Sequence, residues 1–190
     1  MISVDQYLAE VLSIANPLAP LDMPLLDAHG AVLAEDVYAG EHLVLKAGSK
    51  IGSIHIGLAA SIGRNSLPTL PQPRVVVISA GDDLIEPGQL LENSDDEFES
   101  NSWMLTTAVK EAGATGFRVH AIPESHEELR DIIEDQLVRA DLIVISGESK
   151  DESFDLITQV LHELGEVKEV IPAMANAGQM SYGVIGPDKT

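Results

Sequence analysis

The sequence contains no cysteine, and none of its apolar runs is long. Without cysteine the chain cannot form a disulfide, a thiolate metal site or a cysteine nucleophile. No apolar run approaches the ~18 residues that a membrane-spanning helix needs. The N-terminus carries Asp5, Gln6 and Glu10, where a signal peptide would need an apolar centre. These absences predict a soluble, cytoplasmic protein with no membrane partner.

Basic residues are also scarce. The chain has 11 Lys and Arg against 31 Asp and Glu, and its formal net charge at pH 7 is −20. A nucleic acid would therefore be repelled. An anionic small molecule is still compatible with this charge, because backbone N–H groups at a helix start can hold an anion locally. On composition alone, a very soluble protein without such a ligand is the simpler interpretation.

Several common motifs are missing as well. The sequence has no Gly-x-Ser-x-Gly elbow, no P-loop and no Gly-x-Gly-x-x-Gly, which removes the commonest hydrolase and nucleotide-binding signatures. Its six histidines are scattered without a His-x-x-x-His pair, so a zinc site is not indicated.

What is present is the pattern of an α/β fold. Two all-apolar runs, 75–78 and 142–145, are typical of central parallel strands buried on both faces, and we expect them to be neighbours. Strands expected at 74–79, 116–122 and 141–146 alternate with helices expected at 100–112, 125–137 and 153–164. Two short strands, at 167–171 and 180–185, follow. This alternation predicts a three-layer, doubly wound, mostly parallel sheet with right-handed crossovers.

The first 73 residues have a different character. Pro68, Pro71 and Pro73 mark a boundary, so we expect a small α+β appendage over 1–73 and the α/β domain over 74–190. The appendage should contain a helix at 4–12 opened by a capping box, a strand at 33–38, a helix at 53–62 closed by a glycine, and a strand at 67–70.

Candidate site residues lie in three places: after the first strand, at the start of the helix that follows it, and at the end of the strand at 141–146. After the first strand come Ser79, Gly81, Asp82 and Asp83. The glycine permits close backbone approach to a ligand, and either aspartate suits Mg²⁺ or a ligand hydroxyl. An ordinary turn with solvated carboxylates explains the same residues.

The other two candidates are a helix start and a strand end. Ser100, Asn101 and Ser102 offer amide N–H groups that suit an anion, although capping alone also explains them. Ser146 and Gly147 end the strand at 141–146, at the sheet edge where ligands of open α/β folds bind. The acidic run at 92–99 lacks the spacing of a calcium loop and predicts a solvated, mobile loop.

Several motifs in order resemble those of one family. Residues 79–88 (Ser-Ala-Gly-Asp-Asp-Leu…Pro-Gly), 99–105 (Glu-Ser-Asn-Ser…Met-Leu) and the Ser-Gly…Asp frame of 146–155 are similar to motifs of the molybdopterin molybdenumtransferases, the MoeA/gephyrin proteins of molybdenum-cofactor biosynthesis. Residues 26–37 and 40–51 also resemble family segments. The resemblance covers nearly the whole chain and implies that 74–190 is a MoaB/Mog-like molybdopterin-binding domain.

The family implies a set of ligands and roles. Its substrates are adenylated molybdopterin, an anionic pterin, and molybdate, with Mg²⁺ as a cofactor. Asp83 and Asp155 would be catalytic and would hold Mg²⁺ or molybdate. The pterin would contact Ser79, Gly81, Asp82, Ser100, Asn101, Ser146 and Gly147. Family members are usually dimers, and we expect a homodimer that uses the apolar stripe of the helix at 4–12.

The sequence departs from the family in ways that weaken catalysis. The family's second domain, which would follow Ala39, and its C-terminal barrel are missing from the sequence. In the phosphate-facing loop, acidic residues Glu148, Asp151 and Glu152 replace small or apolar ones, and Gly178 replaces a lysine. We therefore expect catalytic capacity to be weakened or lost. The alternative is a non-catalytic, gephyrin-like dimeric scaffold or protein-binding module with an unknown protein partner.

Overall fold

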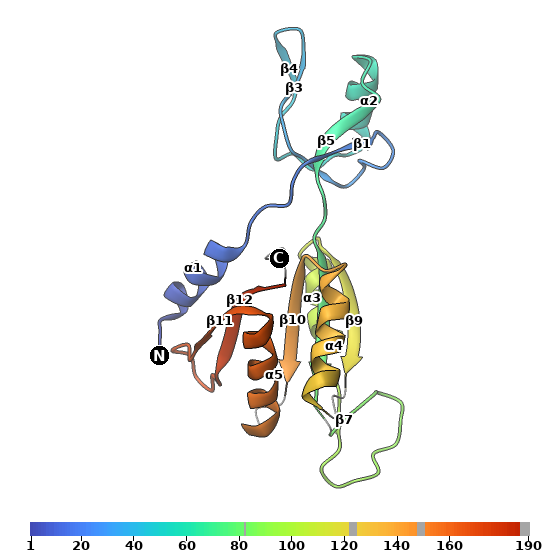
Figure 1. Cartoon of the computed structure of the whole chain (residues 1–190). Coiled ribbons are helices and arrows are strands. Elements are labelled where there is room, and N and C mark those ends of the chain that lie inside the picture. Colours follow the sequence, from blue (N-terminus) through green and yellow to red (C-terminus); the bar gives the residue numbers. More distant parts are fainter. Residues whose placement is uncertain (82, 122–124, 148–150, 187–190) are drawn as a thin grey trace. The chain divides into compact units, whose positions relative to one another are not determined.

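The chain forms two compact units. The computed structural model describes residues 1–81, 83–121, 125–147 and 151–186, and Figure 1 shows the elements. One unit is Pro17–Gln72, and the other joins Met1–Asn16 to Pro73–Thr190. Each has its own cluster of buried apolar side chains. Helix α1 (Val4–Ile14) thus packs with the larger unit although it comes first in the chain. No helix within the described ranges is long and apolar enough to cross a membrane.

The smaller unit consists of short strands and one α-helix. Antiparallel pairing gives a sheet in the order β1-β5-β2 and a separate β3-β4 hairpin. The predicted helix at 53–62 and strand at 67–70 are confirmed to within a residue at each end. The elements are β1 (Leu21–Pro24), β2 (Val32–Leu33), β3 (Val37–Ala39), β4 (His42–Leu45), α2 (Ser53–Ser61) and β5 (Ser66–Leu70).

The single strand predicted at 33–38 is wrong, because the chain turns within it. The carboxylate of Asp36 accepts a hydrogen bond from the backbone N–H of Ala47 at 2.7 Å. This side-chain bond lies between β2 and β3, where the strand is interrupted. Leu33 and Val37 then both reach the core of the unit from different strands.

The larger unit contains a parallel sheet in the order β10-β6-β9. Its central strand is β6 (Arg74–Ala80), flanked by β9 (Thr115–Ala121) and β10 (Leu142–Gly147). The register places Ile78 between Ile145 and Val119. The prediction that the two all-apolar runs form neighbouring parallel strands is confirmed, and so is the α/β class of this unit.

The prediction that both runs are central strands is wrong for β10. Among the described strands, β10 lies at the edge of the sheet. Its residues are only half-buried, and Leu142 is 54% exposed, whereas β6 residues 75–78 are at most 3% exposed. Helix α3 (Asn101–Glu111) packs on β6 and β9, which leaves one face of β10 less covered. An apolar run reports a strand's potential for burial but not its place in the sheet.

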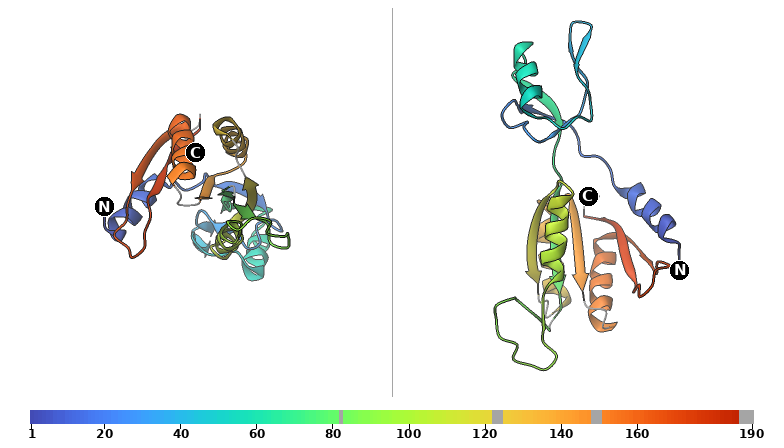
Figure 2. Two further views of the ribbon diagram at one scale, coloured as in Figure 1. Left: turned by 90° about the horizontal axis from the view of Figure 1, so that it is seen from below. Right: turned by 180° about the vertical axis from the view of Figure 1, so that it is seen from behind.

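Helices cover both faces of this sheet. Figure 1 shows α4 (His126–Leu137) in front of it, and the view from behind in Figure 2 shows α3 in front. The predicted N-cap of α4 is confirmed, because Ser125 Oγ accepts a hydrogen bond from the backbone N–H of Glu128 at 3.2 Å. The apolar faces of α4 and α5 (Asp151–Leu164) pack on β6 through a core made by Val76, Ile78, Ala80, Leu129, Ile133, Ala140, Ile157 and Val160.

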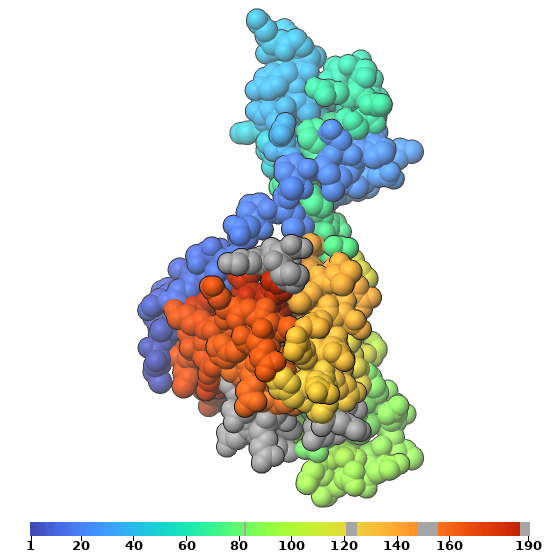
Figure 3. All heavy atoms as spheres, in the orientation of Figure 1, coloured from blue at the N-terminus to red at the C-terminus, as the bar shows by residue number. Residues whose placement is uncertain are grey.

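Helix α1 packs against the hairpin of β11 (Gly165–Val170) and β12 (Met180–Ile185). Ser3 caps α1 as predicted, accepting from the backbone N–H of Gln6 at 3.1 Å. The ring of Tyr7 meets that of Tyr182 edge-on, with centroids 5.6 Å apart. Figure 3 shows the blue atoms of α1 lying against the red atoms of the hairpin. The carboxylate of Glu10 also accepts from Lys168 and Tyr182 on β11 and β12.

Acidification should release α1 from the hairpin. Hydrogen bonds from Lys168, Tyr182 and Gln6 lower the pKa of Glu10 from 4.5 to about 2. Because the folded-state pKa is the lower one, the contact stabilises docking above pH 4.5 and is lost as the pH falls towards 2. Ring resonances of Tyr7, followed by NMR, should move over that interval. In Glu10→Gln they should not respond there, and an unchanged response in this variant would contradict the assignment.

Candidate functional site

The carboxyl edge of the parallel sheet gathers several predicted site residues. The register aligns Ser79 of β6 with Ser146 of β10 on one side and with His120 of β9 on the other. Laterally aligned residues of parallel strands point to the same face, which here is the face that α3 covers. Gly147 lies beside Ala80, and a Cβ added to Gly147 would collide with Ile157 of α5. The structure therefore brings Ser79, Ser146 and Gly147 together.

Helix α3 begins at this edge after Ser100, one of the expected capping residues, but its capping hydrogen bond comes from another side chain. Ser100 is the N-cap residue, yet its side chain makes no capping hydrogen bond. Instead, Glu99 Oε1 accepts from the backbone N–H of Ser102 at 2.7 Å, and Ser102 Oγ donates to Glu99 Oε2 at 2.5 Å. The expected solvation of the run at 92–99 is thus wrong for Glu99, which is 1% exposed. An internal carboxylate occupies the helix start that the sequence left open for an anion.

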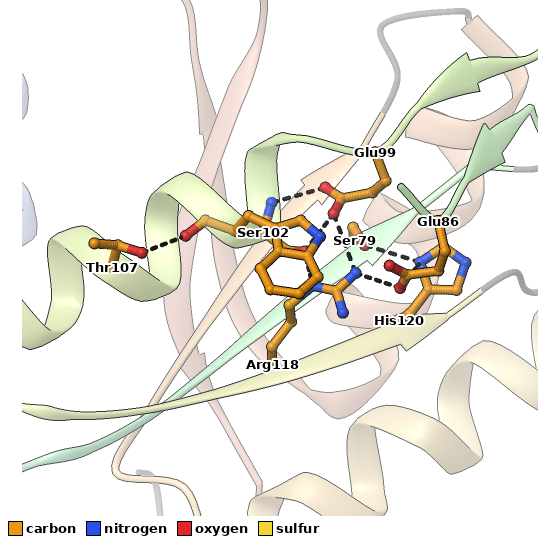
Figure 4. Close-up of polar contacts among 8 residues, drawn as sticks. Ser79, Glu86, Glu99, Ser102, Thr107, Arg118 and His120 are labelled. Carbon is orange, nitrogen blue, oxygen red and sulfur yellow. Dashed lines mark hydrogen bonds and ion pairs between the residues drawn. The ribbon is translucent and has the colours of Figure 1, made fainter. Parts of the chain in front are cut away.

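Arg118 of β9 balances this buried charge. Its Nε donates to Ser102 Oγ at 2.6 Å, and its Nη2 lies 3.4 Å from Glu99 Oε2. The guanidinium stacks on the ring of Trp103, 4.3 Å from the centroid. Nη2 also donates to Glu86, which comes from the loop after β7 (Leu84–Ile85). Figure 4 shows these side chains converging from β9, α3 and the loop.

His120 completes the cluster. Its Nδ1 lies 3.4 Å from Ser79 Oγ and 3.6 Å from Glu86 Oε1. Ser79 is fully buried, whereas the side chains of His120 and Glu86 are 21% and 27% exposed. Two side chains of β9, Arg118 and His120, therefore face one partly exposed carboxylate, and Ser79 of β6 contacts the second of them. We call Ser79, Glu86, Arg118 and His120 the edge cluster.

Glu99 is ionised at neutral pH because of its partners. Burial alone would raise the pKa of Glu99, but hydrogen bonds from Ser102 and Arg118 outweigh burial and hold this pKa below its ordinary value. The carboxylate is therefore a fixed negative charge beside the Arg118 guanidinium.

The loop between β6 and α3 is anchored at both ends. Leu84 and Ile85 of β7 pair in parallel with β8 (Glu97–Phe98). At the far end of the loop, Asp96 accepts hydrogen bonds from the backbone N–H groups of Glu92 and Asn93, both at 2.8 Å. Figures 1 and 3 show residues 86–96 standing out from the rest of the unit.

The remaining predicted site residues lie in different parts of this edge or outside the described residues. Gly81 follows β6, where an added Cβ would lie 3.1 Å from the side chain of Leu84, and Asn101 is exposed in the first turn of α3. The backbone carbonyl of Asp83 accepts from Glu97 N–H at 2.8 Å. Asp82 and the side chain of Asp155 lie outside the described residues. Within the described part of the chain, no three His, Asp or Glu side chains lie together as a metal site.

Sequence reasoning missed Arg118 and His120, although a signal was available. Alternation along β9 puts Gly116, Arg118 and His120 on one face. A Cβ added to Gly116 would lie 3.0 Å from the carbonyl oxygen of Thr106 in α3, so this face packs against that helix. On one face of a strand, a glycine allows a helix to pack closely. An arginine and a histidine at the next two positions of that face place basic side chains at the strand end.

Comparison with known proteins identifies the family of this chain. Molybdopterin molybdenumtransferase 1 of Mycobacterium tuberculosis is 32% identical over 154 residues, which is 81% of this chain and 36% of that protein. Molybdopterin molybdenumtransferase 2 of the same organism is 41% identical over 113 residues, or 60% of this chain and 27% of that protein. The chain belongs to the MoeA/gephyrin family. No protein-family model matches it.

Structural comparison agrees with this membership. The MoeA protein of Pyrococcus horikosii superposes with a TM-score of 0.74 at 19% identity, covering 97% of this chain and 72% of that one. Gephyrin of Dictyostelium discoideum is 30% identical over 146 residues, 71% of this MoeA-like chain and 20% of that protein. The chain spans well under half the length of these curated relatives.

Proposed function

We propose that this chain binds molybdopterin or its adenylated form at the carboxyl edge of the β10-β6-β9 sheet. The observation that carries the proposal is the register that aligns Ser79, Ser146 and His120 at the edge where open α/β sheets bind ligands. Relatives named molybdopterin molybdenumtransferase supply the ligand class. In this proposal residues 74–190 form the doubly wound, MoaB/Mog-like domain of the family. Residues 1–73 are its appendage, of which Met1–Asn16 packs with the larger unit.

Residue roles follow from position at this edge. Hydroxyl and backbone groups contact the pterin and its anionic group, and they come from Ser79, Gly81, Asp82, Ser100, Asn101, Ser146 and Gly147. Asp83 and Asp155 hold Mg²⁺, whose ligands are carboxylate oxygens, and molybdate, itself an anion, reaches these carboxylates through that cation. Because Glu99 occupies the backbone N–H of Ser102 at the start of α3, that amide group is not among the ligand contacts.

Isothermal calorimetry with molybdopterin tests this function. The unmodified protein should bind with a measurable heat. Ser79→Ala should lower the affinity about tenfold, because it removes one hydrogen bond near a charged group. Ser94→Ala, on the exposed loop, is the matched control and should leave affinity unchanged. Absence of binding by the unmodified protein would refute the proposal.

A second candidate function, a gephyrin-like dimeric scaffold with a protein partner, is favoured by the surface of α1. No residue of this helix is buried. Val4, Leu8 and Leu12 are 43%, 55% and 60% exposed along its apolar stripe. An apolar stripe of this kind is typical of an association surface, so we propose that two copies of the chain associate through α1.

Sedimentation distinguishes this association from a monomer. At ~50 μM an obligate dimer should be fully associated. Leu8→Glu should dissociate it, whereas Ser13→Glu, at an exposed residue of the same helix outside the stripe, should not. A stable monomer of the unmodified protein at that concentration would rule out the homodimer.

A further inference from the structure

The guanidinium of Arg118 is held in place independently of the loop. Its Nε donates to Ser102 Oγ at 2.6 Å, and its plane stacks on Trp103. Both partners belong to α3. One edge of the guanidinium, carrying Nη2, remains directed towards the loop, where it meets Glu86. A planar fork fixed in this way is preorganised for an oxyanion.

The two carboxylates that Arg118 contacts are not equivalent. Glu99 is 1% exposed and takes two hydrogen bonds from Ser102 within α3. Glu86 is 27% exposed and comes from the loop. Its Oε1 also lies 3.6 Å from His120 Nδ1, which itself lies 3.4 Å from Ser79 Oγ. Glu99 is therefore a permanent part of the core, whereas Glu86 reaches the cluster from outside.

We propose that Arg118, His120 and Ser79 form a phosphate-binding site and that Glu86 is an intrachain anion that occupies it until a ligand arrives. The ligand class is a phosphate ester. The guanidinium would give two parallel N–H donors to the phosphate, and His120 and Ser79 would contact its other oxygens. The inference deepens the proposed function and rests on it only for the identity of the molecule that carries the phosphate.

In the free protein the carboxylate of Glu86 occupies this site and competes with a ligand anion. A carboxylate tethered by a short loop competes at an effective concentration of about millimolar or more. With Glu86 present the edge cluster already has its anion, and Glu99 adds a second negative charge behind Arg118. A phosphate therefore binds weakly until Glu86 leaves. Neutralising Glu86 should increase phosphate affinity about tenfold, as expected for removal of one like charge at close range.

The test uses inorganic phosphate as the probe and the full-length chain as the protein. Trp103 is the only tryptophan of the chain, and it stacks on Arg118, so its fluorescence reports on the site directly. Phosphate is titrated at constant ionic strength into the unmodified protein, Glu86→Gln and Glu97→Gln. The last variant removes the same charge from an exposed residue of β8 and controls for the general electrostatic field.

Glu86→Gln should bind phosphate about tenfold more tightly than the unmodified protein, and Glu97→Gln within about twofold of it. The double variant Glu86→Gln, Arg118→Lys keeps the positive charge but removes the guanidinium fork. It should bind phosphate about tenfold more weakly than Glu86→Gln alone. Equal affinities of Glu86→Gln and Glu97→Gln would overturn the inference. So would unchanged phosphate binding after Arg118→Lys in a variant whose circular dichroism shows that it is folded.

Calorimetry with molybdopterin separates this inference from the proposed function. If Glu86→Gln gains phosphate affinity but no form of the protein binds molybdopterin, the phosphate site stands and the pterin ligand is wrong. If molybdopterin binds equally well to Glu86→Gln and Glu97→Gln, the proposed function stands and Glu86 is not a competitor.

Discussion

Replacing Glu99 with alanine should lower the free energy of unfolding of the larger unit by about 3 kcal/mol, because the change breaks a buried, hydrogen-bonded charge pair. The backbone N–H and Oγ of Ser102 lose their acceptor, and α3 loses its cap. Arg118 keeps only the more exposed Glu86. Urea denaturation at pH 7, followed by the fluorescence of Trp103, measures the effect in this unit.

The exposed neighbour Glu97 provides the control. Glu97→Ala removes the same charge two residues away and should change the free energy of unfolding by no more than about 0.5 kcal/mol. A second check comes from pH. Since the pKa of Glu99 is lowered in the folded state, its stabilising effect is lost as the pH falls below the ordinary value of 4.5. Equal losses for Glu99→Ala and Glu97→Ala would show that the buried carboxylate is not a structural charge.

The 190-residue polypeptide alone should insert no measurable molybdenum into adenylated molybdopterin. The resemblance to the family implies that the altered loop and the replaced lysine would face the developing negative charge. Here the sequence carries Glu148 in that loop, and Asp151 and Glu152, expected in the loop, begin helix α5. Gly178 replaces the lysine, and Glu99 fills the start of α3. Loss of one preorganised donor typically costs about 10²–10³ in rate, and several such changes occur together.

Reversion of the loop separates binding from turnover. The triple variant Glu148→Gly, Asp151→Val, Glu152→Gly should bind molybdopterin more tightly without gaining activity. Molybdenum insertion by the unmodified chain, assayed without any full-length relative present, would prove the prediction wrong. Transfer activity appearing in the triple variant would show that the loop alone limits the reaction.

Elements with a local chemical signal were predictable from the sequence. The hydroxyls of Ser3 and Ser125 cap their helices where the spacing placed them, because a cap depends only on residues three apart. The all-apolar runs identified β6 and β10 as parallel neighbours. The predicted Ser79 and Ser146 became aligned because both close such strands.

Features that depend on distant partners were not predictable in this way. Glu99 looks like one more member of an acidic run, and its burial becomes favourable only because Arg118 returns to it 19 residues later. The edge position of β10 depends on the strand order of the sheet, which periodicity does not record. Asp36 binds Ala47, 11 residues away, between two strands that the sequence pattern had joined. In each case a partner that is distant in the sequence decided the outcome.

Chemical-shift mapping of the molybdopterin complex tests the placement of the site most directly. With ¹⁵N-labelled protein, addition of molybdopterin should move the backbone amides of Ser79, His120, Ser146 and Gly147 and the side-chain resonance of Arg118 Nε. Resonances of the β11-β12 hairpin and of Pro17–Gln72 should stay in place. Shifts confined to the hairpin or to the smaller unit, with the sheet edge unaffected, would contradict a ligand site at the carboxyl edge.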